Sequence, residues 1–188
     1  WIADGSFILE TATMLGYVQA TRACIKNLTG FELPDGGFEM IPSYHKENGL
    51  VIFMLSRHAQ LTQDKKWLEQ NWSVIQGCIR RIGRLRDSAL VIRQNGEFRL
   101  LPEGFVDGGI RMGNDYSNAQ WCLAGIKWAV KSARWLGKND EARRWKKMFD
   151  DFYSEYAQKA INDLHEDDLG NTYLPVLINN EKDLKPQR

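Results

Sequence analysis

The strongest constraint on the fold is a helix–turn–helix unit that occurs three times along the 188-residue chain. Each copy joins the end of one apolar-periodic segment to a short polar turn and the start of the next segment. The copies lie at Ala12 to Ala20, Ala59 to Leu68 and Ala133 to Ala142. Repeated units of this kind bury their apolar faces against their neighbours. The repeat therefore predicts an all-α array of antiparallel helical hairpins.

Two glycine-rich loops form a second repeat. Leu33 to Met40 reads LPDGGFEM and Phe105 to Met112 reads FVDGGIRM, so Asp35 corresponds to Asp107. Glycine lets such a loop turn tightly, and an apolar helix follows each copy. In an array of hairpins, the loops that enter successive inner helices emerge at the same end. We therefore expect these two loops to lie side by side.

Apolar periodicity and capping residues predict six helices. Their expected ranges are 4–16, 17–28, 47–61, 65–86, 115–136 and 140–164. The first, third and fifth are expected to form an inner set, with the loops at 29–47 and 87–115 at one end. An Asn-Gly pair between apolar runs predicts a small β-hairpin near 89–101. Residues 171–178 have the composition of a short strand.

Composition and charge exclude several classes of function. The formal net charge is +1, which gives no electrostatic case for a nucleic-acid partner. No run of eighteen apolar residues is present, so no membrane span is expected. The three cysteines, Cys24, Cys78 and Cys122, form no CxxC pair. We therefore predict neither a metal site nor a cofactor.

The start of the chain bears on its location in the cell. It begins abruptly at Trp1, inside what resembles motif sequence, so an upstream segment is expected and the absence of a leader says little about export. A periplasmic or secreted bacterial protein is slightly favoured, with the cytoplasm as the alternative.

Short motifs at the starts and turns of the predicted hairpins carry a resemblance to known enzymes. They are WIADG at 1–5, ENGL at 47–50, LTQDKKWL at 61–68, LPEG at 101–104, DGG at 107–109 and YSN at 116–118. Together they resemble the first three hairpins of the six-hairpin, (α/α)6-toroid glycosidases, which include glucoamylase-like, trehalase-like and rhamnosidase-like enzymes. The resemblance covers nearly the whole chain. It implies half a toroid over residues 1–180, followed by a polar tail or linker at 181–188.

The resemblance implies a glycoside hydrolase that acts on an oligosaccharide or glycoside. Cleavage needs a protonated carboxyl to assist the leaving group and a carboxylate to activate water or attack the sugar. Glu103 and Asp107 are the candidate catalytic residues, and either is a candidate for the proton donor. The chain departs from the superfamily at Ala3, where arginine is frequent, and at 110–112, where glucoamylase-like members carry a catalytic glutamate. The second carboxylate is expected from the remaining half of the toroid or from a second copy of the chain.

Polar and aromatic side chains near these loops are candidates for substrate binding, because they form hydrogen bonds to sugar hydroxyls or stack on sugar rings. They are Trp1, Asp4, Asp35, Glu39, His45, Arg111, Asp115, Tyr116 and Trp121. We expect Asp4 to accept a hydrogen bond from a sugar. For His45, a surface histidine without function is the favoured interpretation. The repeat itself favours a shared structural role for the two DGG aspartates.

Two other functions remain open from the sequence. The first is a carbohydrate-binding or interaction module that has the helical scaffold without the chemistry. The second, weaker alternative is an epimerase or another sugar-active enzyme on the same scaffold, in which histidines transfer the protons. The three histidines, His45, His58 and His165, form no motif. Carboxylate catalysis is therefore the favoured prediction.

Overall fold

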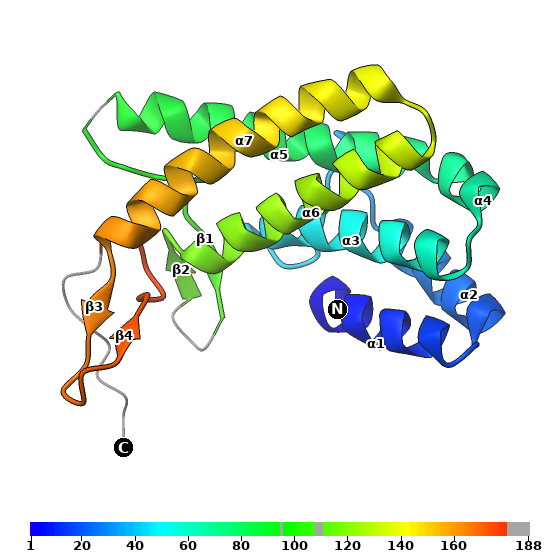
Figure 1. The fold of residues 1–188 in the computed structure, drawn as a ribbon, viewed down its shortest axis with the longest axis horizontal. Helices are drawn as coiled ribbons and strands as arrows, with labels where there is room; N and C mark the ends of the chain where they lie inside the picture. The colour runs from blue at the N-terminus through cyan, green and yellow to red at the C-terminus, as the bar shows by residue number, and fades with distance from the viewer. Residues whose placement is uncertain (95, 108–110, 180–188) are drawn as a thin grey trace.

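The computed structural model describes residues 1–94, 96–107 and 111–179. Within these ranges the chain is all-α, as predicted, with two small antiparallel sheets (Figure 1). The helices are α1 (Ile2–Met14), α2 (Val18–Thr29), α3 (Lys46–Leu61), α4 (Lys65–Gln70), α5 (Trp72–Arg93), α6 (Tyr116–Trp135) and α7 (Asn139–Asn162). The strands are β1 (Gly104–Val106), β2 (Arg111–Gly113), β3 (His165–Glu166) and β4 (Thr172–Tyr173).

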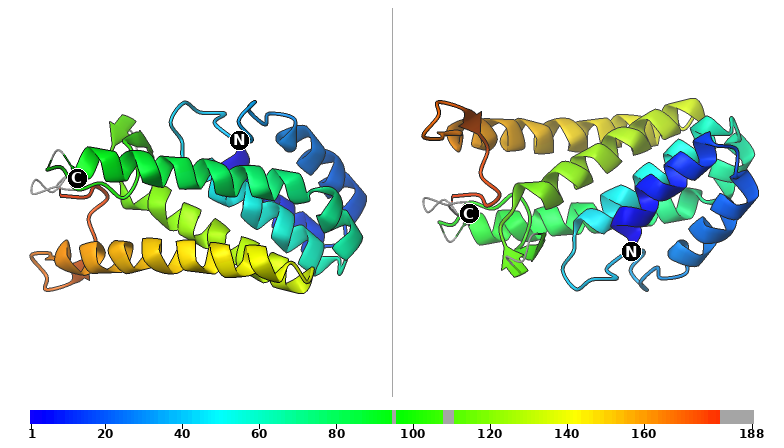
Figure 2. Two further views of the ribbon diagram at one scale, coloured as in Figure 1. Left: turned by 90° about the horizontal axis from the view of Figure 1, so that it is seen from above. Right: turned by 90° about the horizontal axis from the view of Figure 1, so that it is seen from below.

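Helices α1, α3 and α6 form a row in which α3 packs against both of the others. They run parallel to one another, so their N-termini lie at the same end (Figures 1 and 2). Helices α2, α5 and α7 pack on the outside of this row, against α1, α3 and α6 respectively. The predicted inner and outer sets are therefore present as three antiparallel hairpins.

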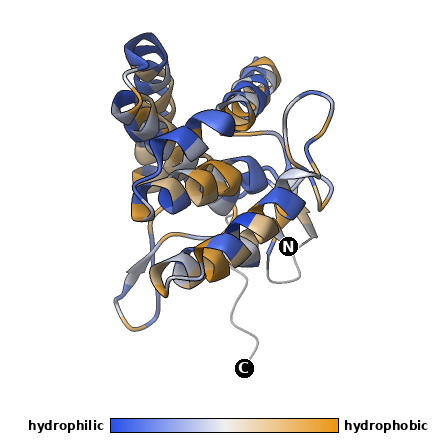
Figure 3. Ribbon diagram, turned by 90° about the vertical axis from the view of Figure 1, so that its right-hand side faces the viewer, coloured by the Kyte–Doolittle hydropathy of each residue, from blue (hydrophilic) through white to orange (hydrophobic). Residues whose placement is uncertain are grey.

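The core lies between these two layers. Its fully buried side chains come mainly from α3, α5 and α6 and include Leu50, Ile52, Ile75, Ile82 and Ile126. Each helix carries hydrophobic and hydrophilic residues along its length, as the hydropathy colouring in Figure 3 shows. Burial of the apolar stripes against neighbouring helices is the main force that holds such an array together.

A pair of glycines brings α3 and α6 unusually close together. A Cβ atom placed on Gly49 would lie 1.9 Å from the carbonyl oxygen of Trp121, and one placed on Gly125 would lie 2.5 Å from the Cα of Gly49. Neither space admits a side chain, so the two backbones are in direct contact. This close crossing fixes α3 relative to α6, and therefore fixes the loops that precede them.

The predicted fourth helix is divided into α4 and α5, and α5 continues to Arg93. The β-hairpin predicted near 89–101 is therefore misplaced, because its first strand is helical. Gly96, at φ 93°, donates its N–H to the carbonyl of Arg93 and ends the helix instead. The hairpin that does form, β1 with β2, lies at 104–113 and pairs Phe105 with Met112.

Other expectations are met in part. Asp115 caps α6 as predicted, since its carboxylate accepts the N–H of Asn118. Asp4 lies inside the first turn of α1 and does not cap it. The strand expected at 171–178 forms in two pieces: β4 pairs with β3, and Leu177 forms an antiparallel bridge with Asp115. The predicted tail at 181–188 lies outside the described residues. No helix in the described ranges has the length and apolar content needed to cross a membrane.

Candidate functional site

The loops that precede α3 and α6 meet, as the sequence predicts. The N–H of Phe105 donates to the carbonyl oxygen of Ser43 at 2.9 Å. The Nε2 atom of His45 lies 3.1 Å from the carbonyl oxygen of Glu103. His45 is buried under this contact, so the expectation of a surface histidine is wrong. Burial also lowers the pKa of His45.

Asp107 is held by two side chains from the α3 end of this contact. The hydroxyl of Tyr44 donates to its Oδ1 at 2.5 Å, and Lys46 forms an ion pair with its Oδ2. The ammonium of Lys46 also donates to Ser117 Oγ at 2.7 Å. Partial burial opposes ionisation of Asp107, but the hydrogen bonds from Lys46 and Tyr44 prevail and lower its pKa. Asp107 is thus a carboxylate whose side chain remains 60% exposed.

The position of Lys46 is set by the first turn of α6. The N–H of Lys46 donates to Asn118 Oδ1 at 2.9 Å, and Asn118 Nδ2 donates to the carbonyl of Phe105 at 3.0 Å. The same Nδ2 donates to Asp115 at 2.6 Å. Asp115 is buried, and this burial raises its pKa. Asp115 and Asn118 therefore join α3, β1 and α6 and act as scaffold for the cluster.

Glu47 is a fully buried carboxyl at the start of α3. Its Oε2 accepts the N–H of Met40 at 2.6 Å, while its Oε1 has no hydrogen-bond partner among the described residues. Burial raises the pKa of Glu47 to about 7. The adjacent Asn48 accepts the N–H of Phe38 at 2.9 Å. These two side chains hold the preceding loop against the helix.

Asp35 and Glu39 are engaged on the outer layer. Asp35 forms ion pairs with Arg81 and Arg84 of α5, each at 2.9 Å, and it accepts the N–H of Gly37. Glu39 lies 3.3 Å from the guanidinium of Arg81. Both acids therefore fasten the first DGG loop to α5. Asp107 has different partners, Lys46 and Tyr44, so the two DGG aspartates do not share the same contacts. The second DGG copy extends into residues 108–110, outside the described residues.

Tyr116 and Trp121 face different surroundings. The hydroxyl of Tyr116 donates to Asp163 at 2.8 Å, at the end of α7. The ring of Trp121 packs edge-on against Phe7 at 5.2 Å and against Phe53 at 6.3 Å. The structure thus separates these two aromatic candidates, because Tyr116 joins the outer layer and Trp121 lies in the inner row.

The four remaining candidates are Trp1, Asp4, Glu103 and Arg111. Trp1 and Asp4 are exposed at the start of α1. Burial raises the pKa of Tyr44, and the hydrogen bond to Asp107 adds to the effect. The carboxylate of Glu103 is half exposed and lies 3.3 Å from Arg99. Arg111 belongs to β2.

Several polar residues of the site are absent from the sequence-based candidates. They are Tyr44, Lys46, Glu47, Asn48, Ser117 and Asn118. The signal available in the sequence was the run HKEN at 45–48, directly before a strongly apolar helix. All four of its side chains are buried. Polar residues at the start of a buried helix require partners. His45 and Lys46 find theirs in the second loop, whereas Glu47 and Asn48 find theirs in the loop that precedes α3.

Comparison with models of known protein families gives no match for this chain. A search among curated proteins likewise finds no similar sequence. The proposal for function therefore rests on the residues and their geometry.

Proposed function

We propose that this chain is a glycoside hydrolase, or the part of its catalytic toroid that carries the first three hairpins. The observation that supports the proposal is the cluster of Asp107, Tyr44 and Lys46, which stands where the two predicted loops meet. An accessible carboxylate with a lowered pKa is one of the two groups that glycoside cleavage requires. Asp4 and Trp1 lie at the same end and are available to bind the sugar.

In this proposal Asp107 is the carboxylate that activates water or attacks the sugar, rather than the proton donor. Its pKa is lowered by Lys46 and Tyr44, so it is ionised at neutral pH. Its side chain remains exposed to a ligand. Lys46 and Tyr44 act through Asp107 and are positioning residues.

Glu103 then takes the role of proton donor. A proton donor requires apolar surroundings or a neighbouring anion to raise its pKa. Its side chain is about half exposed here, so in the active protein the substrate and the remaining half of the toroid, or a second copy of the chain, would have to cover it. If Glu103 is not the proton donor, the second catalytic carboxyl comes from the remaining half of the toroid or from the second copy of the chain.

A non-catalytic carbohydrate-binding module is the second candidate. It is favoured by the fact that both proposed catalytic carboxylates already have cationic partners, Lys46 for Asp107 and Arg99 for Glu103. Ion pairs of this kind also occur as purely structural features. This candidate predicts that sugars bind at the Asp107 cluster and are not hydrolysed.

The test is an assay of the full-length native protein on a panel of oligosaccharides and aryl glycosides. Asp107→Asn and Glu103→Gln are each expected to lower the rate on the order of 10²–10⁴-fold. Glu97→Gln is the matched control, because Glu97 is similarly exposed and pairs with the same Arg99. It is expected to retain full activity.

Each outcome separates the candidates. Full activity in both Asp107→Asn and Glu103→Gln would remove this loop from catalysis. Sugar binding without hydrolysis by the full-length protein, abolished in Asp107→Asn, would favour the binding module. Neither binding nor hydrolysis of any sugar on the panel would contradict both candidates.

A further inference from the structure

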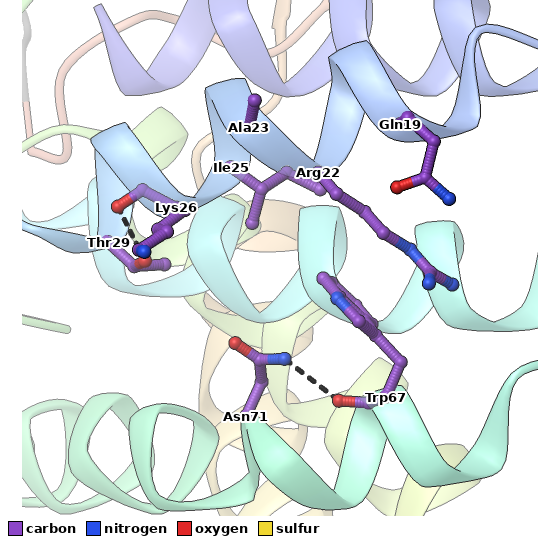
Figure 4. Close-up of a pocket in the computed structure, with 8 residues that line it drawn as sticks. All are labelled: Gln19, Arg22, Ala23, Ile25, Lys26, Thr29, Trp67 and Asn71. Atoms are coloured by element: carbon purple, nitrogen blue, oxygen red, sulfur yellow. Dashed lines mark hydrogen bonds between the residues drawn. The ribbon is translucent and has the colours of Figure 1, made fainter.

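A groove between α2 and α4 lies apart from the Asp107 cluster and is not part of the proposed function (Figure 4). It has a volume of about 360 Å³, which falls within the range of small-molecule sites. Gln19, Arg22, Lys26 and Thr29 of α2 form one wall. The facing wall consists of Trp67 of α4 and of Asn71, which follows that helix.

The groove carries a net positive charge. Arg22 and Lys26 both line it, and none of its lining residues is acidic. Arg22 is held from behind by an ion pair with Asp64 at 2.7 Å, which balances its charge. Within the described part of the chain, Lys26 forms no ion pair. One positive charge is therefore left for a ligand to neutralise.

Arg22 is fixed in position before any ligand arrives. Its Nε donates to His58 Nε2 at 3.1 Å, and its guanidinium lies 5.3 Å from the centre of the Trp67 ring. Its Nη2 takes part in the ion pair with Asp64, which leaves Nη1 available. A guanidinium that is already ordered loses little further entropy when it binds an oxyanion.

Uncharged polar groups complete the lining. Figure 4 shows Gln19 and Arg22 near one end of the groove and Lys26 and Thr29 near the other, with Trp67 and Asn71 opposite. Asn71 donates through Nδ2 to the carbonyl of Trp67 at 2.8 Å, so its Oδ1 remains free to accept a hydrogen bond. Amide groups of this kind bind hydroxyls.

We propose that this groove binds a small hydroxylated anion of about the size of a monosaccharide. Its carboxylate or phosphate oxygens contact Lys26 and Arg22, and its hydroxyl groups contact Gln19 and Asn71. Carboxylate and phosphate share the oxyanion chemistry that the two cations recognise. A carboxylate ligand is distinguished from a phosphate ligand by titration with one probe of each kind.

The test is a titration of the full chain with each probe. Binding is measured by calorimetry and by the shift of the ¹H–¹⁵N signal of the Trp67 indole. The probes are glucuronate, glucose 6-phosphate, inorganic phosphate and neutral glucose. We expect a hydroxylated anion to bind with a dissociation constant on the order of 1 mM or below, and glucose to bind at least about 10-fold more weakly. Preference for glucuronate or for glucose 6-phosphate identifies the oxyanion.

Variants locate the binding. Lys26→Gln is expected to lower the affinity for the preferred anion about 10-fold or more. Lys66→Gln is the matched control, because Lys66 is exposed on α4 and does not line the groove. Glycosidase activity of the full-length protein should be unchanged in Lys26→Gln, since the groove is separate from Asp107. Equal binding of glucose and the anions, no binding of any probe, or unchanged affinity in Lys26→Gln would overturn the proposal.

Discussion

Glu47 is expected to make the protein less stable as the pH rises from about 4.5 to about 7. Burial raises the pKa of its carboxyl from 4.5 to about 7, so within this window the folded state keeps a proton that the unfolded state has released. The loss amounts to about 3 kcal/mol across the window. Glu47→Gln removes this titration and still offers an oxygen to the N–H of Met40.

The measurement is the free energy of unfolding in urea at a series of pH values. The variant is expected to gain stability over the wild type as the pH rises through the window. If the two curves ran parallel, the carboxyl of Glu47 would not titrate as proposed.

His58 is expected to have the opposite effect, with stability lost as the pH falls from about 6.5 to about 4. Burial lowers the pKa of His58 to about 4, and the charge of Arg22 adds to this. Its Nε2 accepts a hydrogen bond from Arg22 and must therefore be unprotonated. Below pH 6.5 the unfolded state takes up a proton that the folded state excludes.

In the wild type the slopes from Glu47 and His58 offset each other where the two windows overlap. In His58→Gln only the effect of Glu47 remains, so the free energy of unfolding in urea should fall as the pH rises. Glu47→Gln should show the reverse slope. Identical slopes in the two variants would refute this pairing.

Asp107 and Lys46 show how much of the site the sequence predicts. Asp107 is identifiable because its loop is repeated and because acids on glycine-rich loops suit sugar chemistry. Lys46 is not, because lysine is normally exposed and its burial depends on a partner 61 residues away. The same long-range contact buries His45. Local patterns therefore identify the loop, but only the tertiary contact identifies the residues that set its charge.

At the scale of elements, the contact between α3 and α6 depends on two glycines. Gly49→Ala or Gly125→Ala would place a methyl group within 2.5 Å of the facing backbone, which forces the helices apart. We expect a loss of about 1–3 kcal/mol in the free energy of unfolding, or more. Thermal and urea unfolding measure it.

Gly83→Ala is the matched control, because Gly83 is also inside a helix but its new Cβ would meet only Met148, at 3.9 Å. Alanine is a better helix former than glycine, so this variant should be as stable as the wild type or up to about 1 kcal/mol more stable. A comparable loss at all three positions would mean that the close crossing is not what matters.

The misplaced hairpin shows why some elements could not be predicted. Leu90, Val91 and Ile92 before an Asn-Gly pair have the composition of a strand and a turn. They continue α5 because Arg86 and Arg93 both pair with Glu155 of α7. The glycine that indicates a hairpin also ends helices, because both uses need a positive φ. Only the neighbouring helix decides between the two.

At the scale of the whole molecule, α1 leaves an apolar surface uncovered. Ile8 is 65% exposed, and Phe7, Met14 and Leu15 of the same segment are also exposed. We expect the isolated chain to associate or to bind an apolar dye. Ile8→Lys should reduce association measured by sedimentation, without loss of helix content by circular dichroism.

Val91→Lys is the control for this prediction, because Val91 is similarly exposed, at 61%, but lies on the outer helix α5. It introduces the same charge and should leave association unchanged. A wild-type chain that sediments as a monomer and binds no dye would contradict the prediction.

The parallel direction of α1, α3 and α6 has an electrostatic consequence. Each helix dipole places about half a positive charge at its N-terminus, and three of these ends lie together. Lys46, in the first turn of α3 and only 3% exposed, adds a full positive charge to them, in the place where a cation is least favoured. Asp107 is the counter-ion that makes this arrangement tenable. Its replacement by asparagine should therefore lower the melting temperature as well as activity, and the two losses can be measured separately.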